Sequence, residues 1–260
     1  MTISKKMSTD IISEKGFNYI DSGEGDPLIL LHGLMGSLSN FKSCIETLPK
    51  KGFRVIMPIL PIYELPILKT NAKQLSFFLE KFIDHMSLNK FFLLGNSLGG
   101  HVGLIFSKKF PEKISGLILT GSSGLYENAL GGSFPKRGDY EFIKKKTEEV
   151  FFNPQHATKE LVDEVFDTIN SRSKLIKILA MAKSAMRHNM KNDLNKIKVP
   201  TCLIWGENDK ITPPDVAKEF NELMPNSELF WIKNCGHAPM MEHSKKFNEI
   251  FCNWVKKINI

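Results

Sequence analysis

The sequence predicts an α/β protein with a doubly wound, mostly parallel sheet. Short apolar segments alternate along the chain with segments of helical periodicity, which is the pattern of strands connected by helices. Most of the apolar segments contain no regularly spaced polar position, as expected of strands that are covered on both faces. The alternation is interrupted once, between Thr120 and Thr201, where about 80 residues contain no clear strand. This interruption predicts a helical insertion in the sheet protein.

The core elements follow in order along the chain. The predicted strands are residues 17–21, 28–31, 54–57, 90–94, 116–120, 202–205 and 228–232. Residues 71–86 place apolar side chains at every third or fourth position, which predicts a helix. A second helix is predicted over residues 97–110 and ends before Pro111, because proline has no N–H to continue it. The last predicted helix runs from about Ser244 through Val255.

The interruption divides the predicted domains. Residues 141–152, 159–169 and 173–188 have helical spacing, and the Gly- and Pro-containing residues 131–138 are expected to form a loop. We therefore expect a core of residues 1–120 and 199–260 and a helical cap of residues 121–198. The cap holds 14 Lys and Arg and 10 Asp and Glu, so its net charge is +4, whereas that of the whole chain is +7.

Composition and charge exclude several classes of function. The chain has 260 residues, of which 42% are hydrophobic, and a net charge of +7, as in an ordinary globular protein. No apolar run approaches the roughly 18 residues of a membrane-spanning helix, and no apolar segment follows Lys5 and Lys6 as in a signal peptide. We therefore expect a cytoplasmic protein without membrane contacts. Basic and aromatic residues are not interleaved, so nucleic acid is not an expected partner.

The four cysteines and seven histidines show no metal-ligand spacing. The cysteines are dispersed through a long chain, which favours buried free thiols over disulfides. The histidines form no H-E-x-x-H or similar pattern, so neither a metal nor a cofactor is expected. The expected partner is a small-molecule substrate, and the oligomeric state stays open.

The strongest local signal is Ser97 within the pentapeptide Gly-Asn-Ser-Leu-Gly. It follows a predicted strand directly and precedes a predicted helix, which is the context of a nucleophile elbow. Glycines two positions before and after the serine allow strand and helix to approach closely around a strained turn. The alternative is a glycine-rich strand-to-helix turn without catalytic meaning, which the flanking strand and helix make less favoured.

A serine nucleophile requires a base and an acid that orients the base, in the chain order Ser, Asp, His. Asp209 follows one predicted strand and His237 follows the next, so both are expected at the carboxyl ends of neighbouring parallel strands. His237 would take the proton of Ser97, and Asp209 would hold the imidazole in the required tautomer. Glu207, two residues earlier, is a rival for the acid, and turn formation is the alternative role for Asp209.

A loop that follows an early strand is predicted to form the oxyanion hole. The residues His32-Gly33-Leu34-Met35-Gly36 place turn-permitting glycines where backbone N–H groups can face a reacting oxygen. The expected donors are the backbone amides of Leu34 and Leu98. His32 is expected to be structural, with its ring hydrogen-bonded to the loop backbone.

Four motifs together resemble the α/β-hydrolase fold family with a helical cap. They are HGLMG, GNSLGG, WGENDKITP and NCGHAPMMEH, in the family's order and spacing, and the resemblance extends from about Phe17 to Val255. It implies a cap inserted after the sixth strand of the sheet. It also implies that the oxyanion loop follows the third strand, the elbow the fifth, Asp209 the seventh and His237 the eighth.

Within this family the motifs are similar to those of capped serine hydrolases, both carboxylesterases and the meta-cleavage-product hydrolases that break a carbon–carbon bond. Asn96, before the nucleophile, carries the similarity to the carbon–carbon hydrolases, and Asn96 and Gly33 are expected to contact substrate. Two positions depart from those enzymes: Ala238 stands where they usually have Trp, and Val165 where they carry a cap arginine. Arg172 or Arg187 is a candidate substitute.

The sequence therefore leaves several functions open. The first is a serine hydrolase of small esters or similar acyl substrates, and the second is a carbon–carbon bond hydrolase of ring-fission diketo acids. Haloperoxidase and hydroxynitrile lyase activities use the same residues, whereas dehalogenases and epoxide hydrolases require Asp in place of Ser97. A protein of another class, a non-catalytic ligand-binding protein on the same fold, is less favoured because all site motifs are complete.

The cap is expected to form a lid that sets specificity. It carries more large apolar side chains than a small helical unit needs for its own core, and we expect a minority of them to face the substrate. These are Phe134, Phe142, Phe151, Phe152, Phe166, Leu179, Met181 and Met186.

Overall fold

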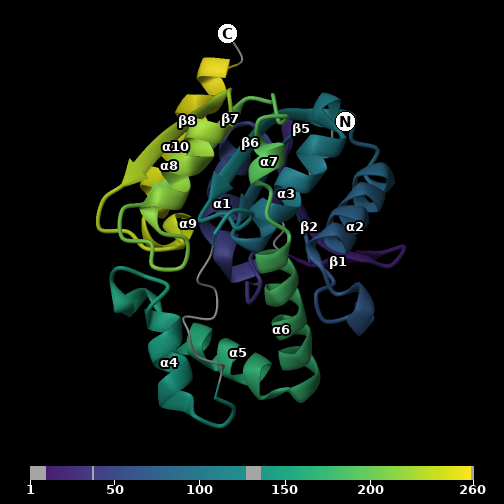
Figure 1. The fold of residues 1–260 in the computed structure, drawn as a ribbon. Helices are drawn as coiled ribbons and strands as arrows, with labels where there is room; N and C mark the ends of the chain where they lie inside the picture. Colours follow the sequence, from purple (N-terminus) through teal and green to yellow (C-terminus); the bar gives the residue numbers. More distant parts are fainter. Residues whose placement is uncertain (1–9, 37, 127–135, 259–260) are drawn as a thin grey trace.

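An eight-stranded sheet organises the protein (Figure 1). The computed structural model describes residues 10–36, 38–126 and 136–258. The strands lie in the order β1-β2-β4-β3-β5-β6-β7-β8, and all neighbours from β4 to β8 are parallel. β2 is antiparallel to β4 and to β1. The strands are β1 (Ile12–Glu14), β2 (Phe17–Ser22), β3 (Asp26–Leu31), β4 (Phe53–Pro58), β5 (Phe91–Asn96), β6 (Ile114–Thr120), β7 (Thr201–Gly206) and β8 (Ser227–Ile232).

Helices cover both faces of this sheet, which explains why its central strands are apolar throughout. On one face lie α2 (Ala72–His85), α3 (Leu98–Lys109), α7 (Lys191–Leu194) and α8 (Pro214–Leu223). On the other lie α1 (Lys42–Thr47), α9 (Pro239–Glu242) and α10 (Ser244–Ile258). In β5, Phe91 and Leu93 face the first layer, whereas Phe92 and Leu94 face the second. Each side chain of the strand is therefore buried, and no polar alternation remains.

The helices α4 (Tyr140–Glu148), α5 (Lys159–Asn170) and α6 (Arg172–Arg187) are inserted between β6 and β7 and extend below the sheet in Figure 1. Their own core is small and contains three buried isoleucines, Ile143, Ile169 and Ile178. The C-terminal half of α6 belongs to the main core, because Met181 and Ala185 pack there. The insertion therefore rests on the sheet domain through one end of α6 and also through the segment after α4, where Phe151 packs into the core on the other face of the sheet.

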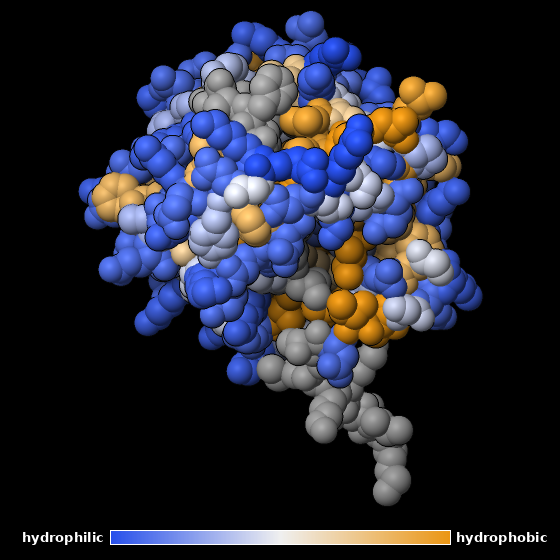
Figure 2. All heavy atoms as spheres, turned by 90° about the horizontal axis from the view of Figure 1, so that it is seen from below, coloured by the Kyte–Doolittle hydropathy of each residue, from blue (hydrophilic) through white to orange (hydrophobic). Residues whose placement is uncertain are grey.

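Figure 2 shows the molecule from the end at which these inserted helices lie. Hydrophilic side chains cover most of this face, and apolar side chains gather on one side of it. Leu68 is 94% exposed, and Ile67 and Ile176 are also exposed. The Lys177 ammonium on α6 donates a hydrogen bond to the Leu65 carbonyl, so α6 touches the loop that leads to Leu68.

The predicted fold class is confirmed, and all seven predicted strands are present, with ends within two residues of those expected. The inserted helices follow the sixth strand, as the family resemblance implies. The sequence patterns did not reveal β1 or the helices α1, α7, α8 and α9. β1 has no buried residue, and α9 has only four residues, so neither element has an apolar period to detect.

Candidate active site

Ser97 lies in a sharp turn between β5 and α3. Its φ and ψ are 53° and −118°, a strained conformation for a residue with a β-carbon. The glycines around it explain how the turn is accommodated. A β-carbon on Gly95 would lie 2.5 Å from the backbone of Gly99, and one on Gly99 would overlap the carbonyl of Leu31 in β3. Strand and helix therefore meet with no space for side chains, and the serine projects above the carboxyl ends of the strands.

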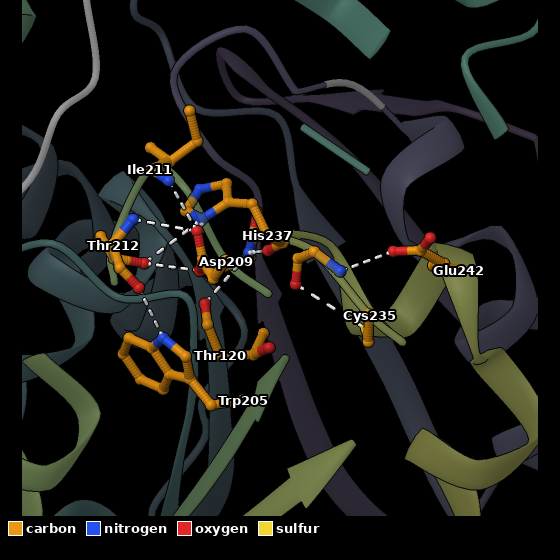
Figure 3. Close-up of polar contacts among 10 residues, drawn as sticks. Thr120, Trp205, Asp209, Ile211, Thr212, Cys235, His237 and Glu242 are labelled. Atoms are coloured by element: carbon orange, nitrogen blue, oxygen red, sulfur yellow. Dashed lines mark hydrogen bonds and ion pairs between the residues drawn. The ribbon is translucent and has the colours of Figure 1, made fainter. Parts of the chain in front are cut away.

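Asp209 and His237 are hydrogen-bonded to each other on the loops after β7 and β8. The His237 Nδ1 lies 2.9 Å from the Asp209 Oδ2, and both residues are buried (Figure 3). An ionised carboxylate only accepts hydrogen bonds, so Nδ1 carries the proton and the lone pair of Nε2 is left free. This is the tautomer that a general base requires. Glu207, the rival acid, is exposed to solvent.

Three further hydrogen bonds hold the Asp209 carboxylate. Its Oδ1 accepts from the backbone N–H groups of Ile211, at 2.8 Å, and Thr212, at 2.9 Å. Its Oδ2 accepts from the Thr212 hydroxyl at 2.8 Å, and this hydroxyl lies 3.3 Å from the His237 Nδ1. The role of Thr212 was not found from the sequence. Its position three residues after Asp209 is the only signal, and it is typical of any Asx turn.

Ser97 and His237 open into the same cavity. Among the described residues, no hydrogen bond joins the Ser97 hydroxyl to the His237 ring. Such contacts are often long in unliganded enzymes and tighten when substrate binds. Gly121 allows the two loops to approach, because its φ is +51° and a β-carbon there would lie 2.8 Å from the His237 Nδ1.

The two expected oxyanion donors lie beside the serine. Leu34 lines the cavity, and Leu98 is the first residue of α3. Within the described part of the chain, neither backbone N–H donates a hydrogen bond to another group of the protein. The N–H of Leu98 directly follows Ser97 at the positive end of the α3 dipole, and Leu34 lines the same cavity as Ser97.

His32 has the structural place that the sequence analysis assigned to it. Its Nδ1 lies 2.8 Å from the Gly33 carbonyl, and its Nε2 accepts from the Leu60 N–H at 3.0 Å. Burial lowers the pKa of this ring, so it stays neutral. His32 thereby holds the loop of residues 32–36 against the segment that follows β4.

Asn96 and Gly33, the expected substrate contacts, both line the cavity. The Asn96 side-chain amide is used within the protein, because it donates to the carbonyls of Thr120 at 3.0 Å and His237 at 3.2 Å. A β-carbon on Gly33 would lie 3.3 Å from the Asn96 Oδ1 and 3.4 Å from the Ser97 β-carbon, so glycine keeps space free beside Ser97. Substrate contact by either residue stays a prediction.

The cavity has a volume of about 190 Å³ and lies between the strand ends and the inserted helices. Its walls are mainly apolar, with Ile143, Val150, Leu161, Val165 and Ile178 among the lining side chains of the cap. Lys146 and Glu149 are the charged lining residues in the described chain, and they pair with each other at 2.7 Å. An apolar ligand therefore matches the cavity better than one with several charges.

The cap residues highlighted by the sequence have different positions. Phe142 and Phe151 line the cavity, whereas Phe152 and Met186 are exposed and Met181 belongs to the main core. Phe134 lies outside the described residues. Neither Arg172 nor Arg187 lines the cavity, and both are exposed.

The described residues contain no group of three or more His, Cys, Asp or Glu side chains placed to hold a metal ion. No helix in residues 10–36, 38–126 and 136–258 is long and apolar enough to cross a membrane.

Comparisons with known proteins agree with this geometry. Residues 26–244 match the family model described as the alpha/beta hydrolase fold. A 2-hydroxy-6-oxononadienedioate/2-hydroxy-6-oxononatrienedioate hydrolase of Pseudomonas putida is 28% identical and covers 92% of this chain and 91% of its own length. The hydrolase of the same name from Escherichia coli K12 is 27% identical, with the same coverage of both chains.

Solved structures extend the comparison. An alpha/beta hydrolase enzyme from the metagenome of lagoon sediments of Mar Chica, Morocco, is 43% identical, with a TM-score of 0.80 and coverage of 96% of this chain and 100% of that one. The meta-cleavage product hydrolase of Pseudomonas fluorescens IP01 has a TM-score of 0.83 at 19% identity, covers 96% of this chain and 98% of its own, and shows the shared fold. The curated relatives favour the carbon–carbon hydrolase alternative over the ester hydrolase that the sequence analysis put first. From its motifs, its fold and these relatives, the chain belongs to the α/β-hydrolase fold family and is an enzyme of the hydrolase class.

Proposed function

We propose that the protein is a serine hydrolase in which Ser97 attacks a carbonyl carbon of a small-molecule substrate. The observation that carries the proposal is the Asp209–His237 hydrogen bond, which leaves the Nε2 lone pair free beside a strained serine in one cavity. His237 takes the serine proton and returns it to the leaving group. The N–H groups of Leu34 and Leu98 stabilise the oxyanion.

The first candidate reaction is cleavage of a carbon–carbon bond next to a ketone. The curated relatives, at 26–28% identity over more than nine-tenths of this chain, support it. The same machinery is suited to the diketo form of such a substrate: Ser97 adds to the ketone, the adjacent carbon leaves as an enolate conjugated with the second carbonyl, and His237 supplies its proton. Water then hydrolyses the acyl group from Ser97 by the reverse proton path.

The cavity supports a substrate with a large apolar part. The curated relatives are named for dioates, which carry two carboxylates, but the described lining of this cavity offers a single cation, Lys146, already paired with Glu149. We therefore propose that the substrate has at most one carboxylate, and that the insertion, within residues 121–198, encloses its apolar end. The Lys146–Glu149 ion pair also favours the second candidate reaction, which is hydrolysis of an uncharged carboxyl ester.

A substrate panel tests the proposal. Purified protein is assayed with p-nitrophenyl acetate, butyrate and octanoate, with 2-hydroxy-6-oxo-6-phenylhexa-2,4-dienoate, and with the dianionic 2-hydroxy-6-oxonona-2,4-dienedioate. We expect the phenyl substrate to have a higher kcat/KM than the dioate, and Ser97→Ala to abolish all turnover. Glu207→Gln is the matched control and should leave turnover unchanged.

Each possible result of the substrate panel supports or contradicts one part of the proposal. Preference for the dioate would contradict the argument from the cavity charge. Turnover of the esters alone would select the second candidate. Activity that survives Ser97→Ala would refute the serine mechanism, as would a folded wild type that neither hydrolyses any substrate nor reacts with a fluorophosphonate probe.

A further inference from the structure

Glu242 is a buried carboxylate that the catalytic machinery described above does not use. It is the last residue of α9, and the residue is only 7% exposed. Its Oε2 accepts hydrogen bonds from the backbone N–H groups of Gly236, at 2.7 Å, and Phe152, at 3.2 Å. Its Oε1 accepts from the N–H of Asn153 at 2.7 Å. Figure 3 shows the carboxylate directed toward the loop that carries Cys235 and His237.

These three donors come from two parts of the chain that are far apart in sequence. Gly236 directly precedes His237 in the loop after β8. Phe152 and Asn153 lie about 85 residues earlier, in the segment between α4 and the short helix Pro154–His156. One carboxylate therefore joins the cap to the loop of the catalytic histidine.

The two segments are in direct contact beside this carboxylate. The His237 N–H donates to the Val150 carbonyl at 2.8 Å. A β-carbon on Gly236 would overlap that same carbonyl, so glycine is needed for the close approach. Val150 and Phe151 also line the cavity. The backbone of His237 and one wall of the cavity are thus part of a single hydrogen-bonded unit.

We propose that Glu242 is a positioning residue that sets the place of the His237 imidazole and ties it to the cap wall formed by Val150 and Phe151. The inference rests on the proposed serine hydrolase function. Without the carboxylate, three backbone N–H groups would lack their acceptor in a buried site, and the segments would separate or admit water to satisfy them. A displacement of about 1 Å at a catalytic group can lower a rate by about 100-fold.

The test compares two variants that change different properties of the side chain. Glu242→Gln keeps the shape but replaces one acceptor oxygen with an NH2 group, which faces a backbone N–H in either orientation. Glu242→Asp keeps the charge but withdraws the carboxylate by one methylene. Glu249→Gln is the matched control, because Glu249 is exposed on the neighbouring helix α10. Each variant is measured by thermal unfolding, by the rate and final extent of Ser97 labelling with a fluorophosphonate, and by kcat and KM for p-nitrophenyl acetate.

Positioning predicts that both Glu242 variants label fully but about 10- to 100-fold more slowly than wild type. The kcat for the acetate ester should fall by the same factor with KM within about twofold, because this small acyl group does not need the cap wall. Glu249→Gln should match wild type in every measurement.

Two outcomes would overturn the inference. Labelling and kcat within twofold of wild type in both Glu242 variants would show that His237 does not depend on this carboxylate. Reduced labelling extent with an unchanged rate in the remaining folded molecules would show that Glu242 only stabilises the fold. Failure of the proposed function itself is distinguishable, because wild type would then not be labelled at Ser97.

Discussion

Replacing Asp209 with Asn should leave the fold intact and nearly abolish activity. The oxygen of the new amide will face Ile211 and Thr212, because their two backbone N–H groups require an acceptor. Its NH2 group must then occupy the position of Oδ2 and point at the His237 Nδ1, now 2.9 Å away. The ring can only accept there, so its proton moves to Nε2. In this tautomer no lone pair remains to receive the proton of Ser97.

The expected loss is about 10⁴-fold in kcat, the size of the corresponding Asp-to-Asn effect in a serine protease. At about 1.36 kcal/mol for each factor of ten, this is about 5.5 kcal/mol of transition-state stabilisation. The effect on the melting temperature should be small by comparison, because the two backbone donors keep their acceptor and the Thr212 hydroxyl can rotate to accept from the amide.

The assay is the steady-state rate on the best substrate of the panel, together with the rate of fluorophosphonate labelling and the melting temperature. Glu207→Gln is the matched control, since this exposed carboxylate lies two residues away and should change kcat by less than twofold. Retention of more than a tenth of wild-type kcat by Asp209→Asn would refute the tautomer argument. A larger loss in Glu207→Gln than in Asp209→Asn would show that the acid is misassigned.

Other changes test the stability and specificity arguments. Burial, with a smaller effect of His188, lowers the pKa of His101 to about 3. In the unfolded chain His101 binds a proton below about pH 6.5, whereas in the folded protein its ring stays neutral down to about pH 3. Between these pH values the free energy of unfolding should therefore decrease by up to about 1.4 kcal/mol for each unit by which the pH is lowered. Urea titrations at several pH values should show that His101→Leu loses this slope, and an unchanged slope would contradict it. Arg54→Met should lower the free energy of unfolding by about 2 kcal/mol, because the Asp21 side chain, 3% exposed, loses the two hydrogen bonds that Arg54 donates to it. The partial exposure of Arg54 keeps the effect from being larger. A loss under about 0.5 kcal/mol in urea titrations would count against this prediction. Arg172→Ala and Arg187→Ala should alter kcat/KM by less than twofold for acidic and neutral substrates alike, since both arginines are exposed and away from the cavity. A selective rise in KM for the acidic substrates would place a carboxylate on one of them.

Local sequence patterns predicted the fold class, and they named the residues of the candidate triad. The apolar strands are recognisable because burial on both faces removes polar alternation, as in β5. The elbow is recognisable because strand and helix meet where Gly95 and Gly99 leave no space for a β-carbon. The strand pattern depends on the apolar character of a single segment. The elbow pattern is short, because Gly95 and Gly99 are four residues apart, although Gly99 also leaves room for the Leu31 carbonyl of β3.

The tertiary structure decided what depends on residues far apart in the chain. Glu207 and Asp209 are both carboxylates after the same strand, and only folding buries one against His237 and exposes the other. The cap residues that line the cavity follow from helix packing, which directs Phe142 inward and Arg187 to solvent. Glu242 has no periodicity or motif of its own. Its three donors come together only when the cap segment and the histidine loop, about 85 residues apart, pack side by side, because a hydrogen bond is set by distance in space and not by spacing in the sequence.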